Sequence, residues 1–523
     1  MLRIFLFVLF GIISNNAFAN IKGKALICDK DSRGYNFISK DKVVISIINF
    51  DEQIIFPVNH SYALSENAIF IKQPINVLNQ EKKTKPIGWI FRRTLDYVSL
   101  NYINGELVEP CKGSYLENYN PSNGKVYSMI PDSDKQDVLY AVSSAKNAFP
   151  SWKNTPKQER SDLLMKLANL IDKNFDELVK AESKDNGKPE SLAAKVDIPR
   201  ASVNLRFFAS AILHDSSNVH EMDGIAINYT LRQPIGVAAC ISPWNLPIYL
   251  LTWKIAPALA SGNTVVAKPS EVTPMTAYIL SKLCIEAGFP KGVINIVHGY
   301  GSKVGDHLTS HPDVPIVSFT GGTETGQHIA KITAPMFKKL SLELGGKNPN
   351  IVFSDANIED AVSIAARAAF TNQGQICLCG SRLFVQAEIY EEFKLKLINK
   401  ASNLVVGDPK DSKTHLGAIV SKQHMNKILT KIKEAESLGG KILIGGHQKI
   451  LDGDLADGYY IEPTIIEGLN FDCSVNQEEI FGPVVSIIPF SSEEEVINMA
   501  NSTKYGLSAS IFTQNVSRAH RVA

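Results

Sequence analysis

From Pro234 to Gly346 the chain alternates short apolar runs with helix-length segments, and this alternation constrains its fold more than any other feature. The runs "IGVAACISP", "NTVVAKPS", "GVINIVHG", "PIVSFTG" and "KKLSLELGG" are each expected to form a strand, and the first is apolar. Strands that alternate with helices in this way predict βαβ units and a mostly parallel sheet. A second α/β block begins at "NPNIVFSD", and both blocks together predict the α/β fold class.

Helices are also expected before this region. The segment "PKQERSDLLMKLANLIDKNFDELVKAESKD" has helical periodicity, and we predict one continuous helix that ends at Asn186-Gly187, a C-cap signal. A further helix is expected from about Asp197, through "PRASVNLRFFASAI".

The composition excludes several classes of protein. With 44% hydrophobic residues, 20% charged residues and a net charge of +1, the chain has no excess of Lys and Arg that would favour nucleic acid as a partner. Seven scattered cysteines do not make a disulfide framework, and no CxxC…CxxC or HExxH spacing predicts a metal site. A chain of 523 residues is too long for one core, so two to four domains are expected.

The first 96 residues differ from the rest of the chain. Residues 1–19 have the layout of a signal peptide: one Arg, an apolar run too short to span a bilayer, and Ala17-Phe18-Ala19 before an expected cleavage site. The alternative is an apolar N-terminus without a targeting role. Residues 20–96 contain β-branched runs broken by polar turns and predict a small β-rich segment of unknown role.

Polar residues follow the predicted strands where a parallel sheet binds its ligands. "SPWNLP" places Trp244 and Asn245 after one strand, and "AKPSE" places Lys268 and Glu271 after the next. A Lys beside an acid suits the two hydroxyl groups of a ribose, although a solvated loop charge is the common alternative for a single Lys. The glycine-rich "FTGGTETG" opens a helix, where free backbone N–H groups favour a phosphate.

The stretch "FTNQGQICLCGSR" holds Cys377 and Cys379, one residue apart. Such a pair could be half of a metal site, a redox couple, a buried pair, or a nucleophile beside a bystander. A metal site is disfavoured because there is no His between Ala334 and His415. A Cys377 thiolate would be a nucleophile if its surroundings were electropositive. Glu343, at the end of "LELGG", could act as a general base if burial raised its pKa.

Six motifs occur in order across residues 101–523: "SPWNLP", "AKPSE", "FTGGTETG", "LELGGKNP", "NQGQIC" and "EEIFGPV". The chain therefore resembles the NAD(P)-dependent aldehyde dehydrogenase superfamily. The resemblance implies a Rossmann-like NAD-binding domain at 97–215 and 234–344, an oligomerisation β-hairpin at 216–233, and an α/β catalytic domain at 345–523. It further implies an aldehyde as substrate and a homodimer or homotetramer as the assembly.

The resemblance also assigns roles to residues. Cys377 matches the nucleophile, Glu343 matches the base that activates the deacylating water, and Asn245 matches the side chain that stabilises the oxyanion; Cys379 matches no catalytic position. Glu271 implies NAD rather than NADP, because a 2′-phosphate would face a like charge. The positions that match cofactor-binding residues are Trp244, Lys268, Glu271, Gly321, Gly322, Thr323, Gly326, Glu479 and Phe481.

Further similarity, in "QICLCGSR" and "NLRFFAS" among others, is to the branch of the family that oxidises muconic semialdehydes. In that branch an Arg binds the carboxylate of the substrate, and Arg200 falls at the matching position, where a guanidinium suits bidentate recognition. Leu246 and Trp253 match the apolar walls of the aldehyde tunnel. The alternative for Arg200 is a surface or ion-paired helix residue.

Both ends of the sequence favour a competing hypothesis. Family members continue several dozen residues beyond "HRVA", including a strand that pairs across the dimer, so we expect a truncated catalytic domain. The signal-like segment implies export, whereas the dehydrogenase core implies a cytoplasmic location. The alternative function is therefore an inactive chimeric or truncated dehydrogenase that at most binds NAD.

Overall fold

The computed structural model describes residues 97–523 and, before them, a set of short strands, and the chain divides into two units, 1–96 and 97–523. In the first unit the strands form one three-stranded antiparallel sheet, β1-β2-β3, and two antiparallel pairs, β4-β5 and β6-β7. The expected signal segment, residues 1–19, lies outside the described residues. The strands of this unit are β1 (Lys24–Leu26), β2 (Tyr35–Ser39), β3 (Lys42–Val44), β4 (Ile47–Asn49), β5 (Glu52–Ile54), β6 (Tyr62–Ser65) and β7 (Ala68–Ile71).

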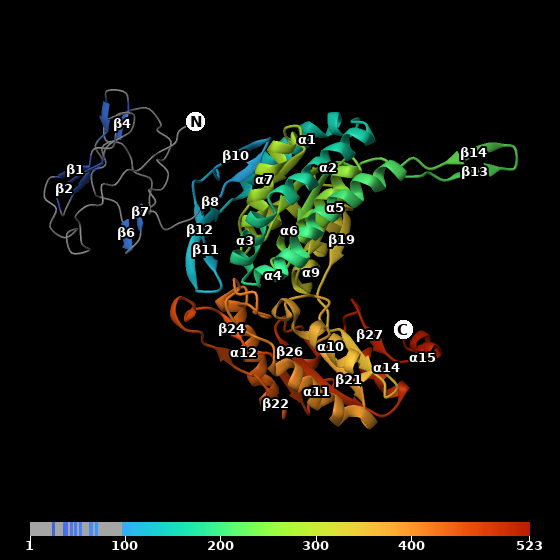
Figure 1. The fold of residues 1–523 in the computed structure, drawn as a ribbon. Helices are drawn as coiled ribbons and strands as arrows, with labels where there is room; N and C mark the ends of the chain where they lie inside the picture. Colours follow the sequence, from blue (N-terminus) through green and yellow to red (C-terminus); the bar gives the residue numbers. More distant parts are fainter. Residues whose placement is uncertain are drawn as a thin grey trace. The chain divides into compact units, whose positions relative to one another are not determined.

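The second unit contains two α/β blocks (Figure 1). The first is built on a seven-stranded sheet with the order β10-β9-β17-β16-β15-β18-β19, in which the last five are parallel. This confirms the α/β class predicted from the alternation of strands and helices. The strands are β9 (Asn101–Ile103), β10 (Glu106–Val108), β15 (Val237–Ile241), β16 (Thr264–Lys268), β17 (Ile294–Ile296), β18 (Ile316–Thr320) and β19 (Lys339–Glu343).

Helices cover both faces of this sheet, which explains why its central strands are apolar throughout. Along β15, Ala238 and Cys240 pack into one hydrophobic cluster, whereas Val237, Ala239 and Ile241 pack into another on the opposite face. The first cluster draws on α2 (Lys157–Lys173), α5 (Ile198–Ala211), α6 (Pro247–Ala260) and α7 (Met275–Ala287). The second draws on α1 (Lys135–Trp152), α8 (Asp306–Thr309) and α9 (Thr323–Thr333).

The continuous helix predicted for residues 156–185 is wrong, because the chain forms two helices there. Helix α2 ends before Asn174, whose side-chain Nδ2 donates to the carbonyl of Leu170, and α3 (Phe175–Asn186) follows. The predicted C-cap is present, since Gly187 has a left-handed φ of 85°. After it come α4 (Glu190–Leu192) and a π-helical turn, η1 (Ala193–Asp197), which leads directly into α5.

The second block is built on a six-stranded sheet with the order β22-β25-β26-β21-β20-β27, parallel except for β22. Its strands are β20 (Pro349–Val352), β21 (Arg382–Gln386), β22 (Lys441–Ile444), β25 (Thr464–Glu467), β26 (Val484–Phe490) and β27 (Ser510–Phe512). Its helices are α10 (Ile358–Phe370), α11 (Tyr390–Ser402), α12 (Lys422–Ser437), α13 (Ser474–Gln477), α14 (Glu493–Ala500) and α15 (Val516–Val522).

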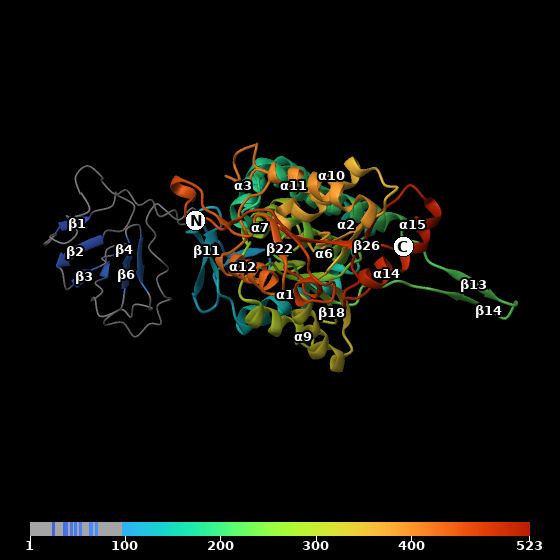
Figure 2. The same cartoon turned by 90° about the horizontal axis from the view of Figure 1, so that it is seen from below.

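Smaller elements complete the unit. The hairpin of β13 (Val219–Met222) and β14 (Ala226–Tyr229) is exposed along both strands and projects away from the rest of the unit in both views (Figures 1 and 2). The remaining strands are β8 (Tyr97–Val98), β11 (Tyr115–Asn120), β12 (Lys125–Pro131), β23 (Gln448–Lys449) and β24 (Tyr460–Ile461). In the described part of the chain, no helix has the length and hydrophobicity that a bilayer crossing requires.

Candidate active site

Cys377 lies in a loop between α10 and β21 whose backbone is unusual. Asn372, Gln373 and Gly374 adopt successive left-handed conformations with φ of 54°, 57° and 68°. Asn tolerates this region better than most residues, and Gly adopts it freely. The amide side chains then fix the loop: Gln373 donates to the carbonyl of Ala418 and accepts from Gly417 N, and Gln375 accepts from Val420 N. The amide-rich sequence before Cys377 therefore builds a rigid turn.

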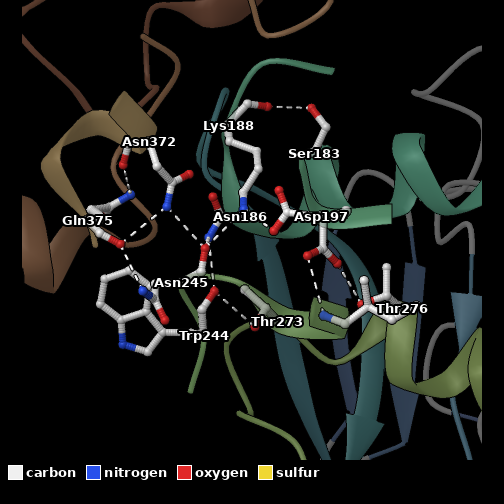
Figure 3. A network of polar contacts seen from close by, with 12 residues as sticks. Ser183, Asn186, Lys188, Asp197, Trp244, Asn245, Thr273, Thr276, Asn372 and Gln375 are labelled. Carbon is white, nitrogen blue, oxygen red and sulfur yellow. Dashed lines mark hydrogen bonds and ion pairs between the residues drawn. The ribbon is translucent and has the colours of Figure 1, made fainter. Parts of the chain in front are cut away.

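Asn245 joins this loop to the first block. It follows β15, is only 3% exposed, and its Nδ2 donates to the carbonyl of Gln375 at 3.0 Å (Figure 3). Asn372 Nδ2 returns a hydrogen bond to the Asn245 carbonyl at 3.1 Å. The Asn245 amide therefore contacts the backbone of Gln375, the residue two positions before Cys377 in the loop.

The electrostatic surroundings of Cys377 differ from the prediction. Burial raises the pKa of the Cys377 thiol, and the carboxylates of Glu479 and Glu343 raise it further. The leading side-chain charges on the half-buried thiol are thus two carboxylates, whereas we expected electropositive surroundings from the sequence.

The two carboxylates occupy different environments. Glu479 packs against the Gly345-Gly346 turn, where its Oε1 accepts from Gly346 N at 2.9 Å, and burial raises its pKa. A Cβ added to Gly345 would lie 2.4 Å from Glu479 Oε2, so an alanine there would have to displace this carboxylate. Glu343, at the end of β19, is exposed. The burial that we expected for this carboxylate is therefore absent.

Cys379 differs from Cys377 in its surroundings, although both are free thiols. Burial raises the pKa of Cys379 to about 12, so this thiol is protonated at neutral pH. The carbonyls of both cysteines accept from Asn348 Nδ2, at 2.7 Å and 3.0 Å, and this holds the two residues against β20. Within the described residues, no group of three or more His, Cys, Asp and Glu side chains could hold a metal ion.

Lys268 and Glu271 meet at the end of β16. Lys268 Nζ lies 2.8 Å from Glu271 Oε2, and Lys268 itself is only 3% exposed. Burial opposes ionisation of Glu271, but the charge and hydrogen bond of Lys268, with a backbone N–H at Gly301, outweigh it and lower the pKa. Glu271 is therefore an ionised acceptor held by its neighbour, as a ribose site requires.

The glycines around the start of α9 leave the helix N-terminus open. Thr323 is the first residue of α9, and Gly322 precedes it without a side-chain cap; a Cβ there would meet nothing within 4 Å. Added Cβ atoms at Gly321 and Gly326 would instead lie 2.5 Å from the Phe319 ring and 2.4 Å from the Leu344 side chain. The segment combines close helix–sheet packing with a helix start that has no side-chain cap, which fits a diphosphate.

Aromatic rings form one wall of the site, and one of them was not predicted. Trp244 packs edge-on against His424 and Phe481, with ring centroids 5.2 Å and 5.1 Å away. Phe481 has a left-handed φ of 59°, and its carbonyl accepts from His424 Nε2 at 2.7 Å. Burial lowers the pKa of His424 to about 4, so the ring is neutral and Nε2 carries the proton. A single His on α12 gives no sequence signal of this contact.

Arg200 lies on α5, opposite α6. Its guanidinium lies over the rings of Tyr249 and Trp253, 5.5 Å and 5.6 Å from their centroids. Trp253 is 40% exposed, whereas Leu246 is buried. Within residues 98–523, no acidic side chain forms an ion pair with Arg200. The sequence did not single out Tyr249, although its position between Leu246 and Trp253 on one helix face could have indicated it.

Comparisons with known proteins agree with this geometry. The sequence pattern of the aldehyde dehydrogenase family matches residues 107–523. A 2-aminomuconic semialdehyde dehydrogenase from Bos taurus is 50% identical over 426 residues, 81% of this chain and 87% of that protein. A 2-hydroxymuconic semialdehyde dehydrogenase from Pseudomonas sp. (strain CF600) is 43% identical over 429 residues, 81% of this chain and 88% of that protein.

The solved structures include an aldehyde dehydrogenase from Bacillus cereus in complex with NAD+. It superposes with a TM-score of 0.80 at 38% identity, over 82% of this chain and 87% of that chain. The resemblance inferred from the six motifs is thereby confirmed. By sequence and by fold, the chain belongs to the aldehyde dehydrogenase family of enzymes.

Proposed function

We propose that this protein oxidises an aldehyde carrying a carboxylate to the corresponding acid, with NAD as the hydride acceptor and Cys377 as the nucleophile. The observation that carries the proposal is the hydrogen bond from Asn245 to the Gln375 carbonyl, which holds a buried amide donor beside the thiol loop. The family assignment gives the reaction class, and the names of the two muconic relatives support the substrate class.

Each protein group has a distinct part in the reaction. The Cys377 thiolate adds to the aldehyde carbon to give a thiohemiacetal, and the new oxyanion accepts hydrogen bonds from Asn245 Nδ2 and the Cys377 N–H. One Nδ2 hydrogen serves Gln375 and the other remains for the oxyanion. The bound cofactor supplies the hydride acceptor that turns the thiohemiacetal into a thioester. Water deprotonated by Glu343 then releases the acid and restores the thiol.

The exposure of Glu343 suits this last step, because a general base for hydrolysis needs access to water. Its strand, β19, pairs with β18 in the first block, and the backbone carbonyl of Glu343 accepts from Gly321 N at 3.0 Å. The base and the glycine-rich segment are thereby fixed to each other.

The described residues fit a nicotinamide dinucleotide. The Lys268–Glu271 pair suits the adenosine ribose, and the start of α9, which has no side-chain cap and is surrounded by Gly321, Gly322, Thr323 and Gly326, suits the diphosphate. Trp244, Phe481 and Glu479 then lie where the nicotinamide half would approach Cys377. The ionised Glu271 favours NAD over NADP, because a 2′-phosphate would face a like charge.

The substrate class rests on Arg200. Its guanidinium is oriented by two aromatic rings and has no acidic partner among residues 98–523, so its hydrogen-bond donors are available to a ligand. A guanidinium held in this way suits a carboxylate, and Leu246 and Trp253 supply apolar walls for the carbon chain. Together these contacts favour a muconic-type semialdehyde.

We further propose that residues 216–233 form the oligomerisation hairpin of a homodimer or homotetramer. Val219, Ile225, Ile227 and Tyr229 are each at least 61% exposed on this projecting hairpin, and large apolar surface of this kind favours contact with another copy.

One assay tests the catalytic proposal. The full chain is incubated with NAD and 2-hydroxymuconic semialdehyde, and NADH formation is followed by absorbance, with Cys377→Ala as the control. We expect turnover that Cys377→Ala abolishes. A wild-type rate equal to that of the control would favour the alternative, a protein that binds NAD at most. Calorimetry would then show whether the protein binds NAD.

A further inference from the structure

Lys188 is a buried cation next to the proposed oxyanion site. It lies in the loop after α3 and is 0% exposed, and its Nζ donates to Asp197 Oδ1 at 2.9 Å and to the carbonyl oxygen of Asn245 at 3.0 Å (Figure 3). Burying an ammonium group is costly unless it is paired and hydrogen-bonded. Both conditions are met here, so the position of Lys188 is tightly specified.

The backbone of Asn245 is the point at which this network converges. Its carbonyl accepts from Lys188 Nζ at 3.0 Å, from Asn372 Nδ2 at 3.1 Å and, at a longer 3.4 Å, from Asn186 Nδ2. Asn186 also donates to the carbonyl of Trp244 at 2.9 Å. The donors come from the end of α3, from the loop after it and from the Cys377 loop, and together they fix the peptide that carries the Asn245 side chain.

A second buried carboxyl group, that of Glu182, belongs to this network. Among the residues that the structure describes, none donates a hydrogen bond to Asp197 Oδ2, and the carboxyl group of Glu182 lies against Asp197. Burial, and then the charge of Asp197, raise the pKa of Glu182 well above its ordinary value. A protonated Glu182 would donate to Asp197 and leave one cation paired with one anion. Glu182 Oε2 also accepts from Thr276 at 2.7 Å, which ties the cluster to α7.

We propose that Lys188 is a positioning residue for Asn245, whose ammonium group fixes the Asn245 peptide so that the carboxamide faces the oxyanion formed at Cys377. This inference rests on the role given to Asn245 in the proposed function. According to this inference, the Lys188–Asp197 pair stabilises the thiohemiacetal through Asn245, in addition to stabilising the core. The π-helical turn that ends at Asp197 also leads into α5, so the same pair links the substrate-facing helix to the oxyanion donor.

The test measures thiohemiacetal formation without cofactor. The full chain is alkylated with iodoacetamide, the modification of Cys377 is followed by mass spectrometry, and increasing succinic semialdehyde protects the thiol by converting it to the thiohemiacetal. Three variants are compared. The paired variant carries Lys188→Met together with Asp197→Asn, the second carries Asn245→Ala alone, and the third carries all three changes. The paired change avoids an unpaired buried charge. Ser183→Ala is the matched control, because Ser183, on α3, is buried and its Oγ donates to the Lys188 carbonyl at 2.6 Å, whereas the hydrogen bonds to the Asn245 carbonyl come from other residues.

We expect the paired Lys188→Met, Asp197→Asn variant to need about tenfold more aldehyde for protection, since misplacing one oxyanion donor costs one to a few powers of ten. Asn245→Ala should need at least as high an aldehyde concentration for protection. Adding the paired change to Asn245→Ala should not raise this concentration further. In Ser183→Ala, the aldehyde concentration needed to protect Cys377 should equal that of the wild type. If circular dichroism shows that the paired Met variant does not fold, Lys188→Gln with Asp197→Asn replaces it. This variant should also need more aldehyde for protection, by a smaller factor.

Three results in the variants would overturn the inference. The first is unchanged protection in the paired variant, and the second is that the paired change weakens protection equally in the presence and in the absence of the Asn245 side chain. The third is an equal weakening of protection in Ser183→Ala. Absence of aldehyde protection in the wild type would remove the role of Asn245 and the inference with it. Protection without NADH formation would instead contradict the proposed dehydrogenase activity and leave the inference supported.

Discussion

The side chain of Asn245 donates to the backbone carbonyl of Gln375 at 3.0 Å, across 130 residues of sequence and between the two α/β blocks. This bond fixes the distance between the amide that we propose as the oxyanion donor, in the first block, and the thiol loop of the second. Since both partners are buried, neither can exchange it for water. The geometry of the site therefore depends on how the two blocks pack against each other.

Replacing Arg200 with Ala should raise KM for a carboxylate-bearing aldehyde by about 10-fold to 100-fold, since a hydrogen bond to a charged group is worth about 1.5–3 kcal/mol. KM for a neutral aldehyde such as propionaldehyde should change little. Arg206→Ala is the matched control on the same helix, because Arg206 is engaged with Asp172 and Asn169. Equal effects of Arg200→Ala on both aldehydes would exclude its role in binding the carboxylate.

Replacing Glu271 with Gln should raise kcat/KM for NADP relative to NAD by about tenfold or more. The lowered pKa of Glu271 keeps it ionised at neutral pH, and a like charge opposite a 2′-phosphate costs at least about 1.4 kcal/mol. The measurement is steady-state kinetics with each cofactor at a fixed aldehyde concentration. An unchanged ratio would mean that another group sets the cofactor preference.

Alkylation of Cys377 should show a pH midpoint above that of a free cysteine, because burial and then Glu479 and Glu343 raise the thiol pKa. Glu479→Gln removes a negative charge that opposes the thiolate, so the midpoint should move to lower pH. It should not fall to the free-cysteine value, because burial remains the largest cause. Rates of iodoacetamide modification across pH, read by mass spectrometry, test this.

Glu478→Gln provides the neighbouring control, since Glu478 pairs with Lys431 at 2.7 Å, whereas Glu479 is the carboxylate with the largest effect on the Cys377 pKa. A shift to higher pH in Glu479→Gln, or equal shifts in both variants, would contradict the assigned electrostatics.

Replacing Gly374 with Ala should lower kcat by about 100-fold or more while NAD binding persists. Its φ is 68°, and a Cβ would lie 2.0 Å from the carbonyl oxygen of Gly482, so the loop must shift, and a displacement of about 1 Å is enough for such a loss. Gly453→Ala is the control, because Gly453 has a similar φ of 62° but nothing within 4 Å of an added Cβ. Activity retained in Gly374→Ala would show that the Cys377 loop is not rigid.

Local sequence patterns were sufficient for the two α/β blocks and for most of the strand ends that form the site. Strand runs such as "IGVAACISP" are apolar at every position because both faces of the sheet are covered, and such a run is visible in sequence. The same patterns failed at Asn174, where helical periodicity continues although the chain forms two helices. Periodicity reports which face is buried, and it does not register a single residue that interrupts the backbone.

The sequence by itself determined the parallel sheets, the glycine-rich helix start and the identity of the thiol loop, because each depends on residues close together in the chain. Only the tertiary structure decided the charge around Cys377, the neutral state of His424 and the convergence of Lys188, Asn186 and Asn372 on the Asn245 carbonyl. These depend on burial and on distances between elements far apart in sequence, and Coulomb and desolvation energies are functions of position in space.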